Sequence, residues 1–494
     1  MKRILSYVLI LSVFLSSCQS NEKFLKEDPR GKLFPESFYN NAAELELGLA
    51  ALYGRAYYNC YKDHDGGFIA AIMGSDDMTT QYNVVQDADI YQITSGNRFL
   101  SIFWGECYST IRAANTLILN YHRAVDATEV RRNEVAGQAY FIRAWSYFFI
   151  VRVFNEIPLI TGVDIDWTVN RSSTQDIYDL IVSDLKNAES LLPTNWAHYP
   201  RIEYVAPTTG SAKALLSSVY LTMAGYPLKQ TENYALAAAK AKEVIDDRSV
   251  YGYRLLDDYA DLWKAMPLKN DELVWGQFFQ AGNSQRAPYA GMPAAYGGWD
   301  IYYAAIKFFN DFPAGPRKDA TFMTKFPQEN GTELDWTQTL RGHPYYKKMW
   351  ETDGYDWSTP WKSNNWQSTR TNQVIRYAEV LLTYAEAQAM ANGTPNALAY
   401  QCVNDVRTRA GLGNLPAGLS GTDFRDAVVA ERGWEFAGPE FAARWFDLVR
   451  LERVEQAALD RDPSETPILV MPTKKNYFAP IPDDEVLKNP NLGL

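Results

Sequence analysis

The chain has 494 residues, 47% of them hydrophobic and 14% aromatic, and carries 48 basic against 59 acidic side chains. This length and apolar content suffice for a packed core divided among about two to four domains. The net charge of −11 argues against a nucleic-acid partner, because affinity for nucleic acid comes from lysine and arginine contacts to phosphate. The 32 tyrosines and 14 tryptophans favour a protein that binds other molecules, since both side chains join an apolar body to a polar tip.

The amino terminus, MKRILSYVLILSVFLSSC, has the pattern of an export signal. Lys2 and Arg3 precede the mostly apolar residues 4–15, a run too short to span a membrane. The run ends in Leu-Ser-Ser before Cys18, which resembles the lipobox of bacterial lipoproteins, where the signal is cut before a cysteine that is then lipidated. We predict that residues 1–17 are removed and that acyl chains on Cys18 anchor the protein to a membrane. An ordinary signal peptide and a buried first helix are the alternatives.

The three remaining cysteines, Cys60, Cys107 and Cys402, lie far apart in the chain and form no C-x-x-C pair. An odd number of widely spaced cysteines predicts no disulfide framework. We expect them to be buried as small apolar side chains.

Apolar periodicity predicts antiparallel helix pairs as the main structural unit. In IRYAEVLLTYAEAQAMANG, the residues from Tyr377 to Gln388 place one apolar stripe along a helix that ends at Asn392-Gly393. A second helix is predicted to follow directly, at about 396–410. The pairs recur at a spacing of about 34–40 residues, as in tetratricopeptide units, which stack because one pair cannot bury its own apolar face. Further pairs are predicted at about 130–153 with 174–191, 209–224 with 232–246, and 422–436 with 440–456.

Residues 250–372 differ from the helical regions, because they hold few periodic stretches and are rich in Gly, Pro, Asn, Tyr and Trp. Examples are YAGMPAAYGGWDIYY at 289–303 and DWSTPWKSNNW at 356–366. Loops of this length are usually functional or disordered, and the high aromatic content argues against disorder. We therefore predict a mostly α fold in which about four tetratricopeptide-like units carry an inserted, loop-rich and aromatic binding lobe. The predicted divisions are a signal peptide (1–17), a lipidated tether and extended arm (18–40), an N-terminal helical scaffold (41–249), the ligand-binding lobe (250–372), and C-terminal helical pairs with a terminal segment (373–494).

Six motifs that follow the lipobox carry a resemblance to a known family. They are GQAYFIRAWSYFFIVRVFNEIPLI (137–160), PTTGSAKALLSSVYLTMAG (207–225), IRYAEVLLTYAEA (375–387), VNDVRTRAGL (403–412), AERGWEF with ARWFDLVRLE (430–452), and YFAPIPDDEVLKNPNL (477–492). Their order and content are similar to those of the SusD/RagB family of outer-membrane glycan-binding lipoproteins, along nearly the whole chain. AGPE at 437–440 departs from the family pattern and predicts a helix break, and the ending NPNLGL departs as well.

The resemblance implies an outer-membrane lipoprotein that is exposed at the cell surface and works with a SusC-like TonB-dependent barrel transporter. In the family, the lipoprotein lies over the barrel as a hinged lid and traps oligosaccharide or peptide. We therefore expect a non-catalytic glycan-binding protein for nutrient uptake. The alternatives are the same fold binding a peptide or another nutrient, a glycoside hydrolase, or a helical scaffold.

The sequence offers little catalytic chemistry. Its four histidines are scattered, and it lacks the zinc-protease, serine-hydrolase and phosphate-loop motifs, so no cofactor or metal is expected. A glycoside hydrolase would need two carboxyl groups about 5–10 Å apart. The adjacent Asp76 and Asp77 are the nearest candidates, but neighbouring carboxylates on a loop point in different directions. Helix capping, or hydrogen bonds to sugar hydroxyls, is the favoured interpretation of these two residues.

Charged residues within the family motifs lie beside apolar helical stripes, where ion pairs between helices are the expected role. They are Arg376, Glu379, Glu386, Arg407, Glu431, Glu435, Arg444 and Asp447. Aromatic residues on helical stripes are assigned to the core in the same way. They are Trp104, Tyr108, Tyr140, Trp145, Phe148, Trp434 and Trp445.

Two regions have the composition of a sugar-binding surface, where an exposed ring stacks on the apolar face of a sugar and amides or carboxylates bind its hydroxyls. By analogy with base stacking, one ring contributes about 1–3 kcal/mol. For any single aromatic residue, core packing is the alternative. The predicted ligand contacts in the first region are Asp76, Asp77, Tyr82, Asn83 and Tyr91. Those in the lobe are Tyr296, Trp299, Tyr302, Trp357, Trp361, Asn364, Asn365 and Trp366.

Overall fold

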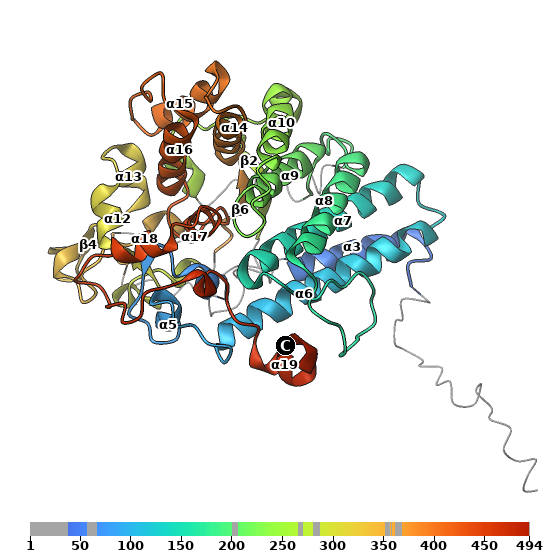
Figure 1. Cartoon of the computed structure of the whole chain (residues 1–494), viewed down its shortest axis with the longest axis horizontal. Coiled ribbons are helices and arrows are strands. Elements are labelled where there is room, and N and C mark those ends of the chain that lie inside the picture. Colours follow the sequence, from blue (N-terminus) through green and yellow to red (C-terminus); the bar gives the residue numbers. More distant parts are fainter. Residues whose placement is uncertain are drawn as a thin grey trace, which may run out of the picture.

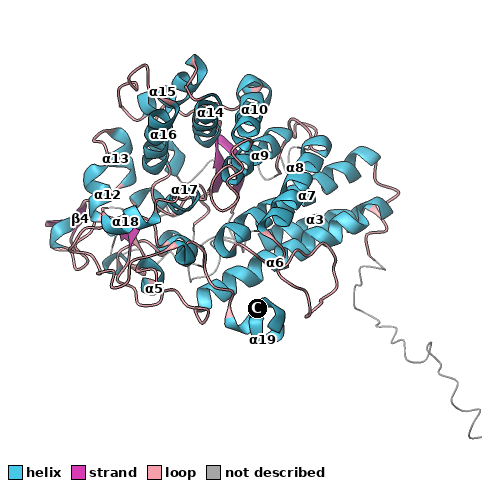
Figure 2. Cartoon of the chain, in the orientation of Figure 1, coloured by secondary structure: helices cyan, strands magenta, loops and turns pink. Residues whose placement is uncertain are grey.

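The computed structural model is dominated by helices, with three small two-stranded sheets (Figures 1 and 2). It describes residues 38–56, 67–199, 206–264, 270–279, 287–350, 356, 358–360 and 368–493. The predicted signal peptide, Cys18 and Cys60 lie outside the described residues. The mostly α fold class is confirmed, whereas the tetratricopeptide-like description stays a prediction.

The N-terminal helices pack side by side, with α7 (Glu129–Phe154) between α6 (Arg98–Asn120) and α8 (Thr174–Leu191) (Figure 1). The Thr128 side chain caps α7 by accepting a hydrogen bond from the Arg131 amide. Because neighbours cover α7 on several sides, most of its second half is apolar and buried. The remaining long helices of this half are α3 (Ala42–Ala56), α9 (Thr209–Met223) and α10 (Asn233–Asp246).

The C-terminal helices centre on α14 (Tyr377–Asn392), which packs against α10, α15 and α16. Gly393 ends α14 in the left-handed conformation, at φ 74°, as the Asn-Gly signal predicted. The predicted helix at 440–456 is wrong as a single element. Its residues form two short helices, because α17 stops where Glu452 adopts φ 54°. The elements are α15 (Ala397–Arg409), α16 (Gly421–Glu435), α17 (Arg444–Arg450), α18 (Val454–Leu459) and α19 (Asp483–Lys488).

Short elements make up the described part of the segment between α10 and α14. The three antiparallel sheets pair β1 with β3, β2 with β6, and β4 with β5. The strands are β1 (Met78–Thr79), β2 (Leu273–Gln277), β3 (Tyr303–Ala304), β4 (Lys325–Pro327), β5 (Glu333–Asp335) and β6 (Asn372–Arg376). The short helices around them are α4 (Gly67–Ile72), α5 (Gln86–Asp89), α11 (Arg248–Tyr251), α12 (Ile306–Asp311) and α13 (Pro316–Thr321).

Ion pairs between elements, predicted for the charged motif residues, are confirmed. Glu435 on α16 contacts Arg376 at 2.6 Å, Arg409 at 2.6 Å and Arg317 at 2.9 Å, with all four side chains buried. Further pairs are Arg407 with Glu431, Arg450 with Glu386, and Arg432 with Asp447. Glu379 differs, because it accepts a hydrogen bond from Ser218.

The aromatic residues assigned to the core lie there. Trp104, Trp145, Phe148 and Trp445 are buried, and Tyr108, Tyr140 and Trp434 are half-buried against the same core. Cys107 and Cys402 are buried free thiols, as expected. Within the described ranges, every helix is too short or too polar to cross a membrane.

Candidate functional site

Pairing of β1 with β3 brings the two predicted binding regions together. Met78 pairs with Ala304, and Thr79 pairs with Tyr303. One residue further along, the Thr80 hydroxyl donates to the Ile301 carbonyl at 2.7 Å. Residues 81–83 and 299–300 therefore emerge beside each other, although about 220 positions separate them in the chain.

Arg341 links these two segments. Its Nε donates to Asp300 Oδ2 at 3.3 Å, and its Nη1 donates to Gln81 Oε1 at 3.3 Å. Asp300 is buried and accepts a hydrogen bond from the Tyr345 hydroxyl at 2.7 Å. It also adopts φ 54°, a conformation that costs free energy for a residue other than glycine and is common at functional sites. These contacts place the Arg341 guanidinium between the two segments.

We call the surface formed by Gln81, Tyr82, Asn83, Trp299 and Arg341 the β1–β3 face. Gln81 and Asn83 are exposed, whereas Tyr82, Trp299 and Arg341 are half-buried. The Trp299 ring packs against Tyr289 at 6.3 Å between centroids. The face therefore combines partly exposed rings with amide and guanidinium groups, a combination suited to ligands that have apolar faces and many hydroxyl groups.

Asp77, a predicted ligand contact, lies in the interior. Its Oδ2 accepts a hydrogen bond from the Gly438 amide at 2.7 Å, and its Oδ1 accepts one from the Ser75 hydroxyl. Burial raises the pKa of this carboxyl to about 6. With no exposed surface, the Asp77 side chain fastens the start of β1 to the α16–α17 connection and does not face a ligand.

Three predicted tyrosines lie in the core as well, which corrects their assignment to a ligand surface. The Tyr91 hydroxyl donates to the Gly74 carbonyl at 2.9 Å, and the Tyr296 hydroxyl donates to the Pro327 carbonyl at 2.8 Å. Tyr302 is 1% exposed. The Tyr296 and Tyr302 rings fill space beneath the loops, whereas the 8% exposed Tyr91 ring also lines a pocket together with Asp76.

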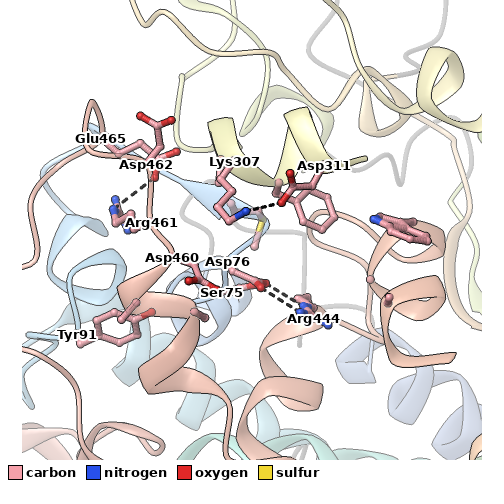
Figure 3. Close-up of a pocket in the computed structure, with 18 residues that line it drawn as sticks. Ser75, Asp76, Tyr91, Lys307, Asp311, Arg444, Asp460, Arg461, Asp462 and Glu465 are labelled. Atoms are coloured by element: carbon pink, nitrogen blue, oxygen red, sulfur yellow. Dashed lines mark hydrogen bonds and ion pairs between the residues drawn. The ribbon is translucent and has the colours of Figure 1, made fainter. Parts of the chain in front are cut away.

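Asp76 lines a different feature, a pocket of about 250 Å³ enclosed by β1, α12 and the α16–α18 region (Figure 3). Arg444 donates hydrogen bonds to both carboxylate oxygens of Asp76, at 2.9 and 3.0 Å. Lys307 and Asp311 form a second pair at 2.6 Å in the same pocket. These acidic and basic side chains of the pocket therefore neutralise one another in ion pairs.

Glu465, also in this pocket, has the acid–base property closest to that of a catalytic acid, because burial raises the pKa of its carboxyl to about 7. Its Oε1 accepts a hydrogen bond from the Ile306 amide at 2.7 Å, and its Oε2 lies 3.4 Å from Arg461 Nε. The side chain is 2% exposed, so its oxygens do not face the open part of the pocket.

Sequence reasoning missed Gln81 and Arg341. Gln81 lies inside the predicted stretch DDMTTQYN, where its position next to Tyr82 was the available signal. Arg341 has no such signal, and only its contact with Asp300 reveals it. The predicted cluster of Trp357, Trp361, Asn364, Asn365 and Trp366 lies outside the described residues and stays a prediction. Among the described residues, no group of three or more His, Cys, Asp or Glu side chains could hold a metal ion.

The sequence and the fold are similar to those of known proteins. The model of the SusD family matches residues 283–493, and a model described as starch-binding and associating with the outer membrane matches residues 23–221. SusD-like protein P2 of Formosa agariphila is 28% identical over 100% of this chain and 99% of its own length.

Solved structures at 23% identity share the fold. A SusD superfamily protein from Parabacteroides distasonis has a TM-score of 0.77, over 90% of this chain and 98% of its own. A laminarin-binding SusD-like protein has a TM-score of 0.75, over 91% of this chain and 98% of its own. Two family models that together span most of the sequence, and a relative that aligns along all of it, lead to one conclusion: the chain belongs to the SusD/RagB family.

Proposed function

We propose that this protein captures oligosaccharides on the β1–β3 face, without cleaving them, and delivers them to a SusC-like TonB-dependent transporter that it covers as a lid. The observation that carries the proposal is the β1–β3 pairing, which brings residues 81–83 beside residues 299–300 and is followed by the contact of Gln81 with Arg341. The laminarin-binding relative supports the same ligand class, since it shares the fold over nearly its whole length.

The expected affinity follows from the few rings on this face. Two stacked rings at about 1–3 kcal/mol each, with hydrogen bonds to hydroxyl groups, correspond to dissociation constants between millimolar and micromolar. Such weak binding suits a protein that must release its ligand to a transporter. It also makes binding sensitive to the loss of one ring.

The pairing of charged groups near the face supports a role without catalysis. Arg444 holds Asp76, and the Asp300 carboxylate accepts from Tyr345 and Arg341. A retaining or inverting glycoside hydrolase needs one free carboxylate and one carboxylic acid on opposite sides of a sugar bond. The Asp300 carboxylate, which adjoins the β1–β3 face, is buried and already hydrogen-bonded, which favours binding over hydrolysis.

Attachment through acyl chains on Cys18 would keep this face at the outer membrane beside the transporter. The family description, which associates such proteins with the outer membrane, supports this placement. A peptide or another nutrient on the same face is the second candidate.

Titration calorimetry with oligosaccharides and peptides tests the proposal on the wild type, Trp299→Ala and Tyr82→Ala. We expect oligosaccharide binding that falls about tenfold in each variant, because each removes one stacking ring. Trp167→Ala is the matched control, since Trp167 is a 49% exposed indole on the loop between α7 and α8. Binding that is equal in all four proteins would place the ligand elsewhere, and binding of peptides alone would replace the glycan.

A further inference from the structure

A further concave surface lies between the first half of α6, the loop that joins α7 to α8, and the C-terminal segment around α19. It is an open groove of about 290 Å³. Trp104 and Ile111 on α6, together with Leu492, form a buried apolar floor. Two apolar side chains of the loop also line it, Ile165 and Trp167, and these are 52% and 49% exposed. We call it the α6 groove. Exposed apolar side chains that adjoin an apolar floor indicate a surface that another segment covers.

The charged groups that line the α6 groove are partly unpaired. Within the described ranges, the exposed guanidinium of Arg112 has no carboxylate at ion-pair distance. The exposed carboxylates of Asp164 and Asp166 have no lysine or arginine at that distance, and Asp166 accepts hydrogen bonds only from its neighbour Thr168. An apolar floor with unpaired charges of both signs is complementary to a peptide that carries apolar residues between acidic and basic ones.

The chain enters the described part of the molecule beside the same helix. The Arg123 guanidinium donates to Asn120 Oδ1 at 3.1 Å and to Asn40 Oδ1 at 2.8 Å. Arg112, Thr116 and Asn120 are spaced four residues apart, so they lie on one face of α6. This face therefore leads from Asn40 to the Arg112 end of the α6 groove, along about 12 Å of helix.

Residues 18–37, which lie outside the described residues, precede this point of entry. Leu33 and Phe34 are adjacent apolar residues in this arm, and Pro35 favours an extended backbone at Phe34. An extended chain spans about 3.3 Å per residue, so the six residues from Phe34 to Asn40 cover about 20 Å. This reach exceeds the distance from Asn40 to the groove, so Leu33 and Phe34 can lie on its floor.

The charges of the arm match those of the groove in order. Glu36 lies between Phe34 and Asn40, and Arg112 lines the end of the groove that is nearer to Asn40. Lys32 lies on the other side of Leu33, where the two unpaired carboxylates of the α7–α8 loop are available. Exposed ion pairs of this kind add little affinity but fix the direction in which a segment binds.

We propose that the α6 groove binds the N-terminal arm of this same chain, with Leu33 and Phe34 on the apolar floor, Glu36 toward Arg112, and Lys32 toward the loop carboxylates. Covalent attachment favours the arm over any separate partner, because a short linker gives an effective concentration on the order of millimolar. Weak contacts then suffice. A docked arm would leave only residues 19–29 as the tether to the predicted lipid anchor at Cys18, and would thus fix where the anchored chain leaves the molecule.

Limited trypsin digestion of residues 18–494 tests the inference, because the arm has cleavage sites inside and outside the part that should dock. All proteins carry Cys18→Ser, which prevents acylation. They are the otherwise unchanged chain, the double variant Ile165→Ala/Trp167→Ala, and Leu487→Ala. Leu487 is the matched control, because its side chain is 83% exposed on α19 and does not line the groove. Thermal melts verify folding, and mass spectrometry measures the initial rate of each cleavage.

We compare the rate of cleavage after Lys32, which should be docked, with the rate after Lys23, which should not. This ratio should be about tenfold lower in the otherwise unchanged protein than in a synthetic peptide of residues 18–37, because docking hides the bond at Lys32. It should rise about tenfold in the double variant, which loses two apolar contacts, and stay unchanged in Leu487→Ala. A ratio that is the same in the protein and the peptide, or that does not respond to the double variant, overturns the inference.

Photo-crosslinking identifies the surface that the arm contacts. We replace Phe34 with p-benzoylphenylalanine and expect crosslinks within the same chain to residues that line the α6 groove, located by mass spectrometry. The same replacement of Phe24 is the control and should give no such crosslinks. Crosslinks from position 34 to another surface or to a second copy of the chain, equal crosslinks from both positions, or none at all would overturn the inference and leave the groove open to a separate partner.

Discussion

The carboxylate of Asp76 and the guanidinium of Arg444 form a two-contact ion pair, at 2.9 and 3.0 Å, across 368 positions of sequence. The pair joins the loop before β1 to the first residue of α17. It places Asp76 in the wall of a pocket, whereas Gln81, Tyr82 and Asn83 of the β1–β3 face follow five to seven residues further on. The first prediction concerns this pair.

Asp76→Asn should destabilise the fold by about 2 kcal/mol, because the guanidinium of Arg444 loses its charged partner while remaining largely out of water. The side chains are 26% and 16% exposed, which keeps the loss below that of a fully buried pair. Urea denaturation measures the change. Asp311→Asn in the same pocket is the control. The Asp311 side chain is 61% exposed, so its ion pair with Lys307 should contribute less than about 0.5 kcal/mol. Unchanged stability with lost glycan binding would instead make Asp76 a ligand contact.

Arg341→Lys should weaken oligosaccharide binding about tenfold with little effect on stability. A lysine ammonium that contacts both Asp300 and Gln81 keeps one N–H group for ligand hydroxyls, whereas the planar guanidinium keeps three. Calorimetry on the variant provides the test. Leu340→Ala, at the neighbouring and 89% exposed position, should bind as the wild type does. Equal affinity of the Lys variant and the wild type would show that Arg341 only positions the loop.

The helices could be predicted because their signals are local. The apolar stripe predicted a helix at 209–224, and α9 spans Thr209–Met223. The predicted helix at 440–456 failed for a reason that is not local. The carbonyl of Arg450 accepts a hydrogen bond from the Tyr226 amide at 2.9 Å. A segment that is distant in sequence therefore binds the backbone at the end of α17. Tertiary contacts of this kind cannot be detected from the apolar periodicity of the sequence.

The site could be predicted only in part, because composition does not say which ring faces outward. In AYGGWDIYY, Trp299 is half-buried, whereas Tyr296 and Tyr302 lie in the core. The Tyr302 ring occupies the space where a side chain at Gly291 would be, which is a contact between loops. The placement of residues 81–83 beside residues 299–300 likewise depends on a strand pair two residues long. Such a short register has no period-2 pattern that sequence reasoning could detect.

Glu435→Gln should destabilise the protein by about 3–5 kcal/mol, since three buried arginines share this one carboxylate. Burial acts to raise the pKa of Glu435, but the three guanidinium groups hold it well below the ordinary value, so the side chain is ionised at neutral pH. Urea denaturation at pH 7 measures the loss. Asp246→Asn, which breaks an exposed pair with Lys242 within α10, should cost less than about 0.5 kcal/mol. A similar small loss in both variants would mean that the buried network contributes no net stability.

Glu465→Gln should reveal a titration in the neutral range. Burial raises the pKa of Glu465 from 4.5 to about 7, so the folded state favours the protonated carboxyl. The contribution of this group to stability is complete below about pH 4.5 and is lost as the pH rises through 7. A glutamine does not titrate, so the unfolding free energy of the variant relative to the wild type should rise by as much as about 3 kcal/mol between pH 4.5 and 8.

Urea denaturation of both proteins at pH 5, 6, 7 and 8 measures this difference. Loss of the contact with Arg461 adds an offset that does not depend on pH, so the slope carries the result. Asp426→Asn is the control. Although burial acts to raise the pKa of Asp426, Arg425 and Arg453 hold it below the ordinary value, so its difference from the wild type should stay constant over this range. A flat difference for Glu465→Gln as well would contradict the prediction, and would mean that water or Arg461 keeps this carboxyl ionised throughout.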